Sequence, residues 1–130
     1  MQIEKTEAEL NANGSVDAKA VAARLAAARK AFLDVVDFMA GAAKTSPNDV
    51  YAGSVPYLML TGNLVAGWQL ARALLVAQEL SAKGEDKQFM DAKIATARFY
   101  ADHILVKTSA LRDAVVDGAA SVMALPQDAF

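Results

Sequence analysis

The chain has 130 residues, no cysteine, and a formal net charge of −2 from 13 basic and 15 acidic residues. This length suits one domain with a core of its own, and the absence of cysteine excludes disulfides, thiolate nucleophiles and cysteine-ligated metals. The charged residues form no basic stripe that could neutralise phosphates, so the composition also argues against nucleic-acid binding.

Residues 1–14 form a polar lead-in. The first ten, MQIEKTEAEL, are charged where a signal peptide would be apolar, so we expect no export and a cytoplasmic protein. Residues 2–10 could form a short polar helix, but their sequence gives such a helix little to bury.

A first long helix is predicted over residues 16–41. Ser15 or Asp17 can serve as its N-cap, because both side chains accept hydrogen bonds from free backbone N–H groups. Its apolar residues recur at alternating spacings of three and four, which is typical of a helix packed lengthwise on a partner. These residues are Ala18, Val21, Leu25, Ala28, Phe32, Val35 and Met39. The run TSPN at 45–48 then ends the helix.

A second helix is predicted over residues 49–83, and it contains the most informative stretch of the chain. Residues 55–80 carry only two charges, Arg72 and Glu79. As a helix this stretch would be roughly 39 Å long. A helix apolar on nearly every side must be surrounded by other helices or by lipid. We therefore expect it to form the centre of the fold.

A membrane span is the alternative for this stretch. Its uncharged part, 55–71, includes Pro56, Asn63 and Gln69, whereas a spanning helix needs roughly 20 predominantly apolar residues. The other apolar stripes of the chain could bury it, so we favour burial in protein and expect no membrane insertion. Gly62 and Gly67 lie inside this helix, where each glycine costs about 1 kcal/mol relative to alanine. Close approach of a neighbouring backbone is the predicted reason for both.

Two further helices are predicted over residues 86–106 and 108–125. The apolar stripe of the third helix comprises Met90, Ile94, Ala97, Ala101 and Ile104, widened by Phe89, Ala92, Thr96 and Phe99. In the fourth helix the residues in step are Leu111, Val115, Gly118, Val122 and Leu125, and Asp117-Gly118 is a possible interruption. The predicted fold is therefore all-α: a single domain over residues 1–130, built as an up-and-down four-helix bundle with a long apolar central helix.

No catalytic or metal-binding constellation stands out in the sequence. His103 is the only histidine, and although histidine can act as a base or a ligand, this one has no partner at ligand spacing. A packing or surface role is the favoured interpretation. A di-iron bundle would need inward carboxylates and several histidines, and no serine or threonine lies next to a His and Asp that could activate it. We therefore assign no catalytic, cofactor-binding or metal-binding residue.

Four polar or aromatic residues interrupt the apolar second helix: Tyr57, Asn63, Trp68 and Gln69. In the simplest interpretation, Asn63 and Gln69 satisfy each other, a nearby backbone group or an oligomer partner. Tyr and Trp are also enriched at interfaces. We favour a candidate interface over a small-molecule pocket.

Three segments in this order carry a family resemblance: DVYAGSVPYLMLTGNLVAGWQLARAL, FMDAKIATARFYADHIL and DGAASVMALPQDAF. The match spans residues 48–130 and resembles the extreme C-terminal domain of long-form bacterial acyl-CoA dehydrogenases. The resemblance implies a fragment of a larger enzyme, in which earlier domains hold FAD and the catalytic Glu. One departure is Leu105-Val106-Lys107, where the family usually has Leu-Pro-Gln. Without proline, the third and fourth helices could join by a different turn or run on further.

Two functions follow as expectations. In the first, the chain is a non-catalytic domain that docks on the preceding catalytic domains or a second subunit, and supports the acyl-CoA site of a homo-oligomeric FAD enzyme. In the second, it is a free-standing helical interaction module, which could also bind at the surface of a membrane. A reading frame that continues upstream into a flavin domain would favour the first function.

Overall fold

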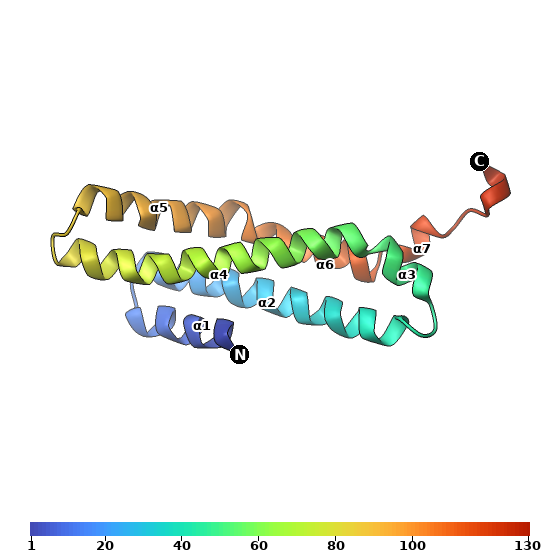
Figure 1. Ribbon diagram of the computed structural model, residues 1–130, viewed down its shortest axis with the longest axis horizontal. Coiled ribbons are helices and arrows are strands. Elements are labelled where there is room, and N and C mark those ends of the chain that lie inside the picture. The colour runs from blue at the N-terminus through green and yellow to red at the C-terminus, as the bar shows by residue number, and fades with distance from the viewer.

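The computed structural model describes residues 1–130 and contains only helices and their connections (Figure 1). The elements are α1 (Gln2–Asn13), α2 (Val16–Ala42), α3 (Pro47–Ala52), α4 (Ser54–Ala82), α5 (Lys87–His103), the 3₁₀ turn η1 (Leu105–Lys107), α6 (Thr108–Val116), α7 (Ala119–Val122) and the 3₁₀ turn η2 (Gln127–Ala129). The predicted all-α class is confirmed.

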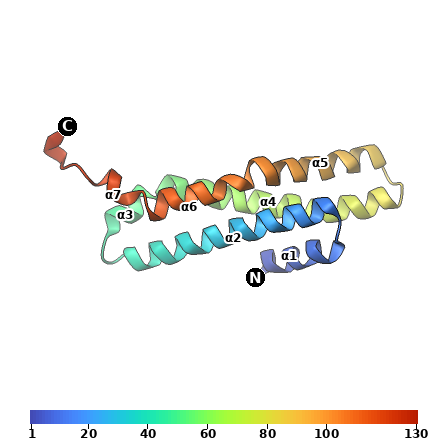
Figure 2. The same ribbon diagram turned by 180° about the vertical axis from the view of Figure 1, so that it is seen from behind.

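The chain runs up and down the long axis of an elongated bundle. Its four rods are α1, α2, α4, and α5 with α6, and each runs opposite to the one before it (Figures 1 and 2). The α2–α4 pair packs against α1 on one side and against both α5 and α6 on the other. The up-and-down arrangement is therefore present. However, α1 is one of its four rods, whereas the sequence suggested a separate rod over residues 108–125.

The difference arises where α5 meets α6. An up-and-down bundle of the four predicted helices requires the chain to reverse between residues 106 and 108. Instead, η1 carries the chain onward in the same direction, and the Thr108 hydroxyl donates to the Leu105 carbonyl oxygen at 2.7 Å. No proline or glycine lies at this joint to turn the chain, so α5 and α6 form one kinked rod, and α1 supplies the remaining rod.

The expectation that residues 2–10 bury little was wrong. Ile3, Thr6 and Leu10 are buried, and Leu10 is fully so. They are spaced three and four apart and lie on the face of α1 that packs on α2 and α4. These three buried residues hold α1 on the bundle, although its other positions are polar or alanine.

The α2 helix matches its prediction closely. The Ser15 hydroxyl accepts a hydrogen bond from the Ala18 N–H at 3.1 Å, so Ser15 is the N-cap. Asp17, the alternative cap, instead pairs with Arg98 on α5 at 3.1 Å. The predicted stripe forms much of the core, with Ala18, Val21, Leu25, Ala28 and Val35 buried.

The predicted helix at 49–83 is divided in two. The division lies at Gly53, where a Cβ atom would stand 2.8 Å from a methyl carbon of the buried Val115, so α6 approaches too closely for any side chain. Pro56 falls in the first turn of α4, as expected.

The expectation that α4 is surrounded on all sides was wrong. One face is buried, with Leu60, Leu64, Ala71 and Leu74 in the core, but Val55 and Leu58 on the other side are 68% and 70% exposed. Only three other rods exist, and all of them lie behind or beside α4 in the view of Figure 1. None of the helices combines the length and hydrophobicity of a membrane span.

The two α4 glycines have different environments. A Cβ at Gly67 would lie 2.6 Å from a methyl carbon of Leu105, so the packing there is close, as predicted, but the neighbour is a side chain rather than a backbone. A Cβ at Gly62 would meet nothing within 4 Å, so the same prediction for Gly62 was wrong within this chain.

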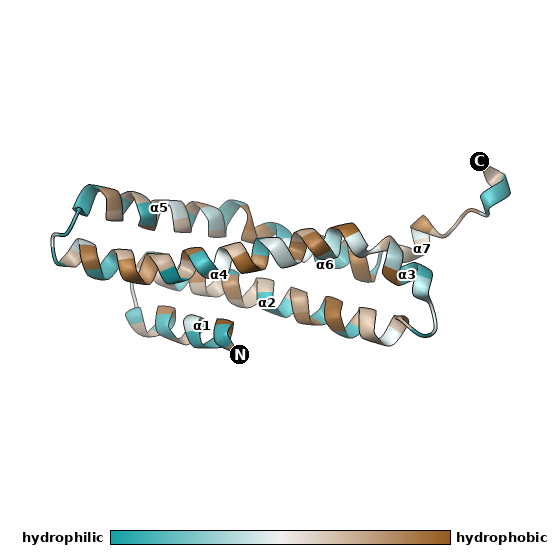
Figure 3. Ribbon diagram, viewed as in Figure 1, coloured by the Kyte–Doolittle hydropathy of each residue, from teal (hydrophilic) through white to brown (hydrophobic).

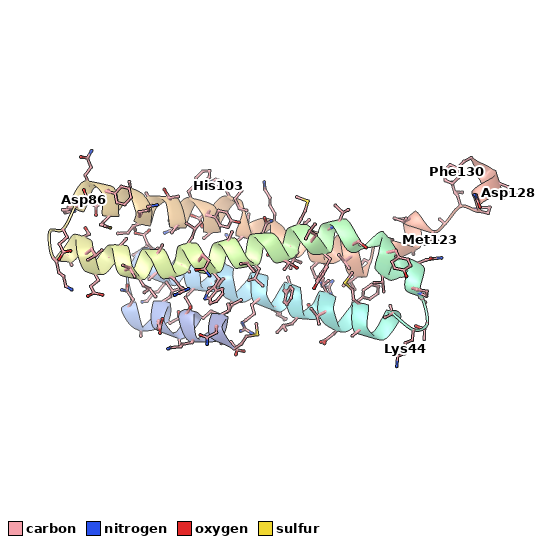
Figure 4. All side chains as sticks on the ribbon, in the orientation of Figure 1. Lys44, Asp86, His103, Met123, Asp128 and Phe130 are labelled. Atoms are coloured by element: carbon pink, nitrogen blue, oxygen red, sulfur yellow. The ribbon has the colours of Figure 1, made fainter.

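The C-terminal part leaves the bundle. The predicted interruption at Asp117-Gly118 separates α6 from α7, which ends at Val122 rather than at 125. Beyond it, residues 123–130 are all exposed and project from the end of the bundle (Figure 4).

Candidate functional site

His103 lies on the surface of α5 (Figure 4), where its ring stacks on Phe99 with centroids 4.4 Å apart. Phe99 is itself 59% exposed, so it does not widen the buried stripe of α5 as the sequence suggested. The other three residues predicted to widen that stripe are also exposed: Phe89, Ala92 and Thr96. No group of three or more His, Asp or Glu side chains lies close enough together to hold a metal ion. The geometry around His103 matches the surface role favoured from the sequence.

Ion pairs make two surface carboxylates, those of Glu79 and Asp91, weaker bases. A hydrogen bond from Lys83 at 2.6 Å lowers the pKa of Glu79. Hydrogen bonds from Lys87, and secondarily from Ser81, lower the pKa of Asp91. A general base works best with a pKa near the operating pH, so these shifts have the wrong direction for proton abstraction.

Two of the four candidate interface residues have partners inside the domain. The Tyr57 ring stacks on Phe32 of α2, with centroids 6.1 Å apart. The Trp68 Nε1–H donates to the Thr6 hydroxyl of α1 at 2.9 Å. Both side chains therefore bind α4 to its neighbours within the bundle.

The other two candidates point elsewhere and do not bond each other. Asn63 is half-buried, and its backbone oxygen accepts a hydrogen bond from the Tyr100 hydroxyl at 3.3 Å. Gln69 is exposed, and its side-chain oxygen accepts from Arg72 at 3.1 Å. The four residues thus do not gather on one face of α4, and only Gln69 lies on its open face.

That open face is the main surface feature that the sequence reasoning missed. Its large apolar side chains are 46–70% exposed: Val55, Leu58, Met59, Val65 and Val76. Figure 3 shows that hydrophobic residues recur along the length of α4. Contiguous exposed apolar surface of this kind marks interaction sites in soluble proteins. The near-absence of charge in residues 55–80 was the available signal, but it was interpreted as evidence for burial within the chain.

A groove adjoins the second half of the open face. It measures about 540 Å³ and lies between α4 and the start of α5, with Glu9 of α1 also on its wall. Val76 and Leu80 line it from α4, and Phe89 and Met90 line it from α5. Arg72 and Lys93 also line the groove, each with its cation over an aromatic ring, at 5.6 Å from Trp68 and 5.2 Å from Phe89 respectively. The groove is thus mainly apolar, with two cations among its walls.

Comparison with known proteins matches this chain to one family along nearly all of its length. Residues 1–126 match the family described as acetyl-CoA dehydrogenase C-terminal like. The 3-methylmercaptopropionyl-CoA dehydrogenase of Ruegeria pomeroyi is 46% identical over 121 residues, which is 93% of this chain and 20% of that protein. The broad-specificity linear acyl-CoA dehydrogenase FadE5 of Mycobacterium tuberculosis is 32% identical over 129 residues, covering 97% of this chain and 20% of that protein.

The chain thus spans about one fifth of the length of both relatives. The match also includes residues 1–47, which lie outside the segments that carried the resemblance in the sequence. Because it covers α1, both long helices and the α5–α6 rod, it concerns the whole bundle. The chain belongs to the acetyl-CoA dehydrogenase C-terminal-like family.

Proposed function

We propose that this chain is the non-catalytic C-terminal domain of an FAD-dependent acyl-CoA dehydrogenase, and that it supports the assembly and the acyl-CoA site of that enzyme. The parent enzyme would introduce the α,β-double bond of an acyl-CoA and would be a cytoplasmic homo-oligomer. The observation that carries the proposal is that both relatives are named as CoA-thioester dehydrogenases and contain this domain as one fifth of their length.

The residues of this chain do not suit FAD. Its elements are all helical, and the α4 glycines lie within a helix rather than in a turn whose backbone could cradle a pyrophosphate. The carboxylates with resolved pKa shifts are surface groups in ion pairs. Flavin binding and proton abstraction are therefore assigned to the part of the parent enzyme outside this chain, and no step is attributed to residues 1–130.

The open face of α4 supports a docking role. It combines large exposed apolar side chains with a neighbouring apolar groove, and no charged residue lies between Val55 and Arg72. Such a surface is suited to contact with protein rather than to permanent exposure.

The first test uses the 130-residue chain alone. It should purify without the visible absorbance of bound flavin, and it should not reduce an electron acceptor with any acyl-CoA. Bound flavin or acyl-CoA-dependent reduction would contradict the assignment of a non-catalytic domain.

The second test uses the parent enzyme, truncated before this domain. The truncated enzyme should lose melting temperature and native assembly, and its activity should fall as a consequence. Full activity, assembly and melting temperature after truncation would refute the supporting role.

A further inference from the structure

The α4 helix carries a second packing seam that nothing in the chain fills. Its residues alternate in spacing by four and three: Val55, Met59, Gly62, Ala66, Gln69, Ala73, Val76 and Leu80. This spacing brings one residue per turn to a single face, as in helices that pack lengthwise. The inner face of α4 is filled by the core, whereas on this outer seam Val55, Met59 and Val76 are 68%, 54% and 56% exposed.

We propose that this outer seam pairs with the same seam of a second copy of the chain, with the two α4 helices antiparallel about a two-fold axis. The seam has a similar pattern of side-chain sizes from either end, since its terminal residues are large and most of its middle residues are small. An antiparallel copy therefore places Met59 against Val76 and Gly62 against Ala73. A surface that is self-complementary in this way is what a closed, two-fold dimer requires.

This arrangement explains why a glycine stands at position 62. A Cβ there would meet nothing within 4 Å in the isolated domain, so the chain itself does not explain why a residue of poor helix propensity stands in the middle of α4. Against a second helix, Gly62 and Ala66 would allow the two backbones to approach closely at the centre of the seam.

The groove beside the second half of the seam supplies a shape match. It measures about 540 Å³ and is lined by Val76, Leu80, Phe89 and Met90 among others. At the opposite end of the seam, Val55 and Leu58 stand out from α4 with about two thirds of their surface exposed. In the antiparallel pair these protruding side chains face the groove of the other copy, and the two-fold axis repeats the contact.

The available area is on the scale that a stable dimer needs. Six large apolar side chains on this face are 46–70% exposed: Val55, Leu58, Met59, Val65, Val76 and Phe89. If each side chain buries on the order of 100 Å², the six together contribute roughly 600 Å² per copy, without counting polar or small residues. A standard interface buries about 800 Å² per partner. The seam itself carries no charge, so pairing two copies brings no like charges into its centre.

The proposal is tested on the 130-residue chain by sedimentation velocity over a range of concentrations. The wild type should form a dimer. Met59→Glu and Val76→Lys should each weaken it at least tenfold, because each introduces charges against apolar residues of the other copy. A mixture of the two variants should pair again, since the carboxylate introduced in one chain then faces the ammonium group introduced in the other. Val122→Glu alters an exposed valine outside the seam and should leave the dimer intact.

Gly62→Leu adds a separate arm. The space around Gly62 is open within one chain, so this variant should keep its helical circular dichroism and its melting temperature as a monomer. It should nevertheless fail to dimerise, because the side chain holds the two helices apart.

A wild type that stays monomeric well above micromolar concentrations would overturn the proposal, and the seam would then be left to another domain of the parent enzyme. Variants that dimerise like the wild type would show that the seam is not the contact surface. A mixture that fails to pair would contradict the antiparallel register. These outcomes are independent of the truncation test for the supporting role, because they concern contacts between two copies of the isolated domain.

Discussion

Trp68 of α4 donates its indole N–H to the Thr6 hydroxyl of α1 at 2.9 Å, and this bond joins residues 62 positions apart. The Thr6 hydroxyl in turn donates to the Gln2 carbonyl oxygen at 3.3 Å. Thr6 is only 4% exposed, so this short chain of hydrogen bonds satisfies polar groups that have little access to water. It holds α1 onto the bundle.

Thr6→Val tests this bond, because valine keeps the shape of threonine and removes the acceptor. The unpaired indole N–H should lower the free energy of unfolding by about 1 kcal/mol. Urea unfolding followed by the fluorescence of Trp68, the only tryptophan, measures the change at the site itself. Thr96→Val is the matched control, since the Thr96 hydroxyl is exposed and donates only within its own helix. Equal losses in the two variants would contradict a specific role for the bond.

The same residues show where reasoning from the sequence succeeded and where it failed. The Ser15 cap and the α2 stripe were predictable, because both depend on residues one or two turns away in the same helix. The tight site at Gly67 was predictable because glycine lowers the stability of a helix interior. Trp68 was assigned to an interface because it is an aromatic residue in an apolar helix. Its actual partner, Thr6, lies in a segment whose polar composition concealed its three buried positions.

The apolar character of α4 shows a second kind of limit. Periodicity identifies which faces of a helix avoid water, but it does not say whether the cover comes from the same chain or from another one. In this domain α2, α1 and the α5–α6 rod cover one side of α4, and the other side remains open. Hydrophobicity alone therefore predicted a central helix where the fold has a helix with one exposed apolar face.

An ion pair between α1 and α2 gives the second prediction. The Arg29 guanidinium donates two hydrogen bonds to the Glu7 carboxylate, at 2.7 and 3.1 Å, and only 21% and 12% of the two side chains are exposed. Glu7→Gln removes the charge and one acceptor oxygen, so we expect a loss of about 1 kcal/mol in the free energy of unfolding. Chemical denaturation measures it.

Glu9→Gln is the control for that change on the same helix. Glu9 stands 3.9 Å from Lys5 in a largely exposed pair, and such pairs contribute well under about 1 kcal/mol. If Glu9→Gln destabilised the domain as much as Glu7→Gln, the loss would reflect the net charge of α1 rather than the paired geometry at Arg29.

The two glycines of α4 provide a matched pair for the third prediction. Gly67→Leu should destabilise the domain by roughly 1–3 kcal/mol or more, because the new side chain overlaps the buried Leu105 and forces repacking between α4 and η1. Gly62→Ala should stabilise the monomer by up to about 1 kcal/mol through helix propensity, since the added methyl group meets nothing. Thermal unfolding at high dilution separates the two effects. A rise in melting temperature for Gly67→Leu would rule out close packing as the reason for that glycine.

The last prediction concerns alkaline pH. Burial raises the pKa of the Tyr100 phenol above its ordinary value of about 10, and its hydroxyl links α5 to the Asn63 carbonyl oxygen of α4. A folded-state pKa above the unfolded one means that the unfolded chain releases this proton first as the pH rises. The stabilisation from the protonated phenol is therefore complete below about pH 10 and is lost as the pH rises through the raised pKa. Urea unfolding at a series of alkaline pH values should show the wild type losing stability more steeply than Tyr100→Phe, which has no proton to release. Tyr51→Phe, which removes a phenol that is 71% exposed, should keep the slope of the wild type. Parallel pH profiles for the wild type and Tyr100→Phe would show that ionisation of this half-buried phenol is not coupled to unfolding.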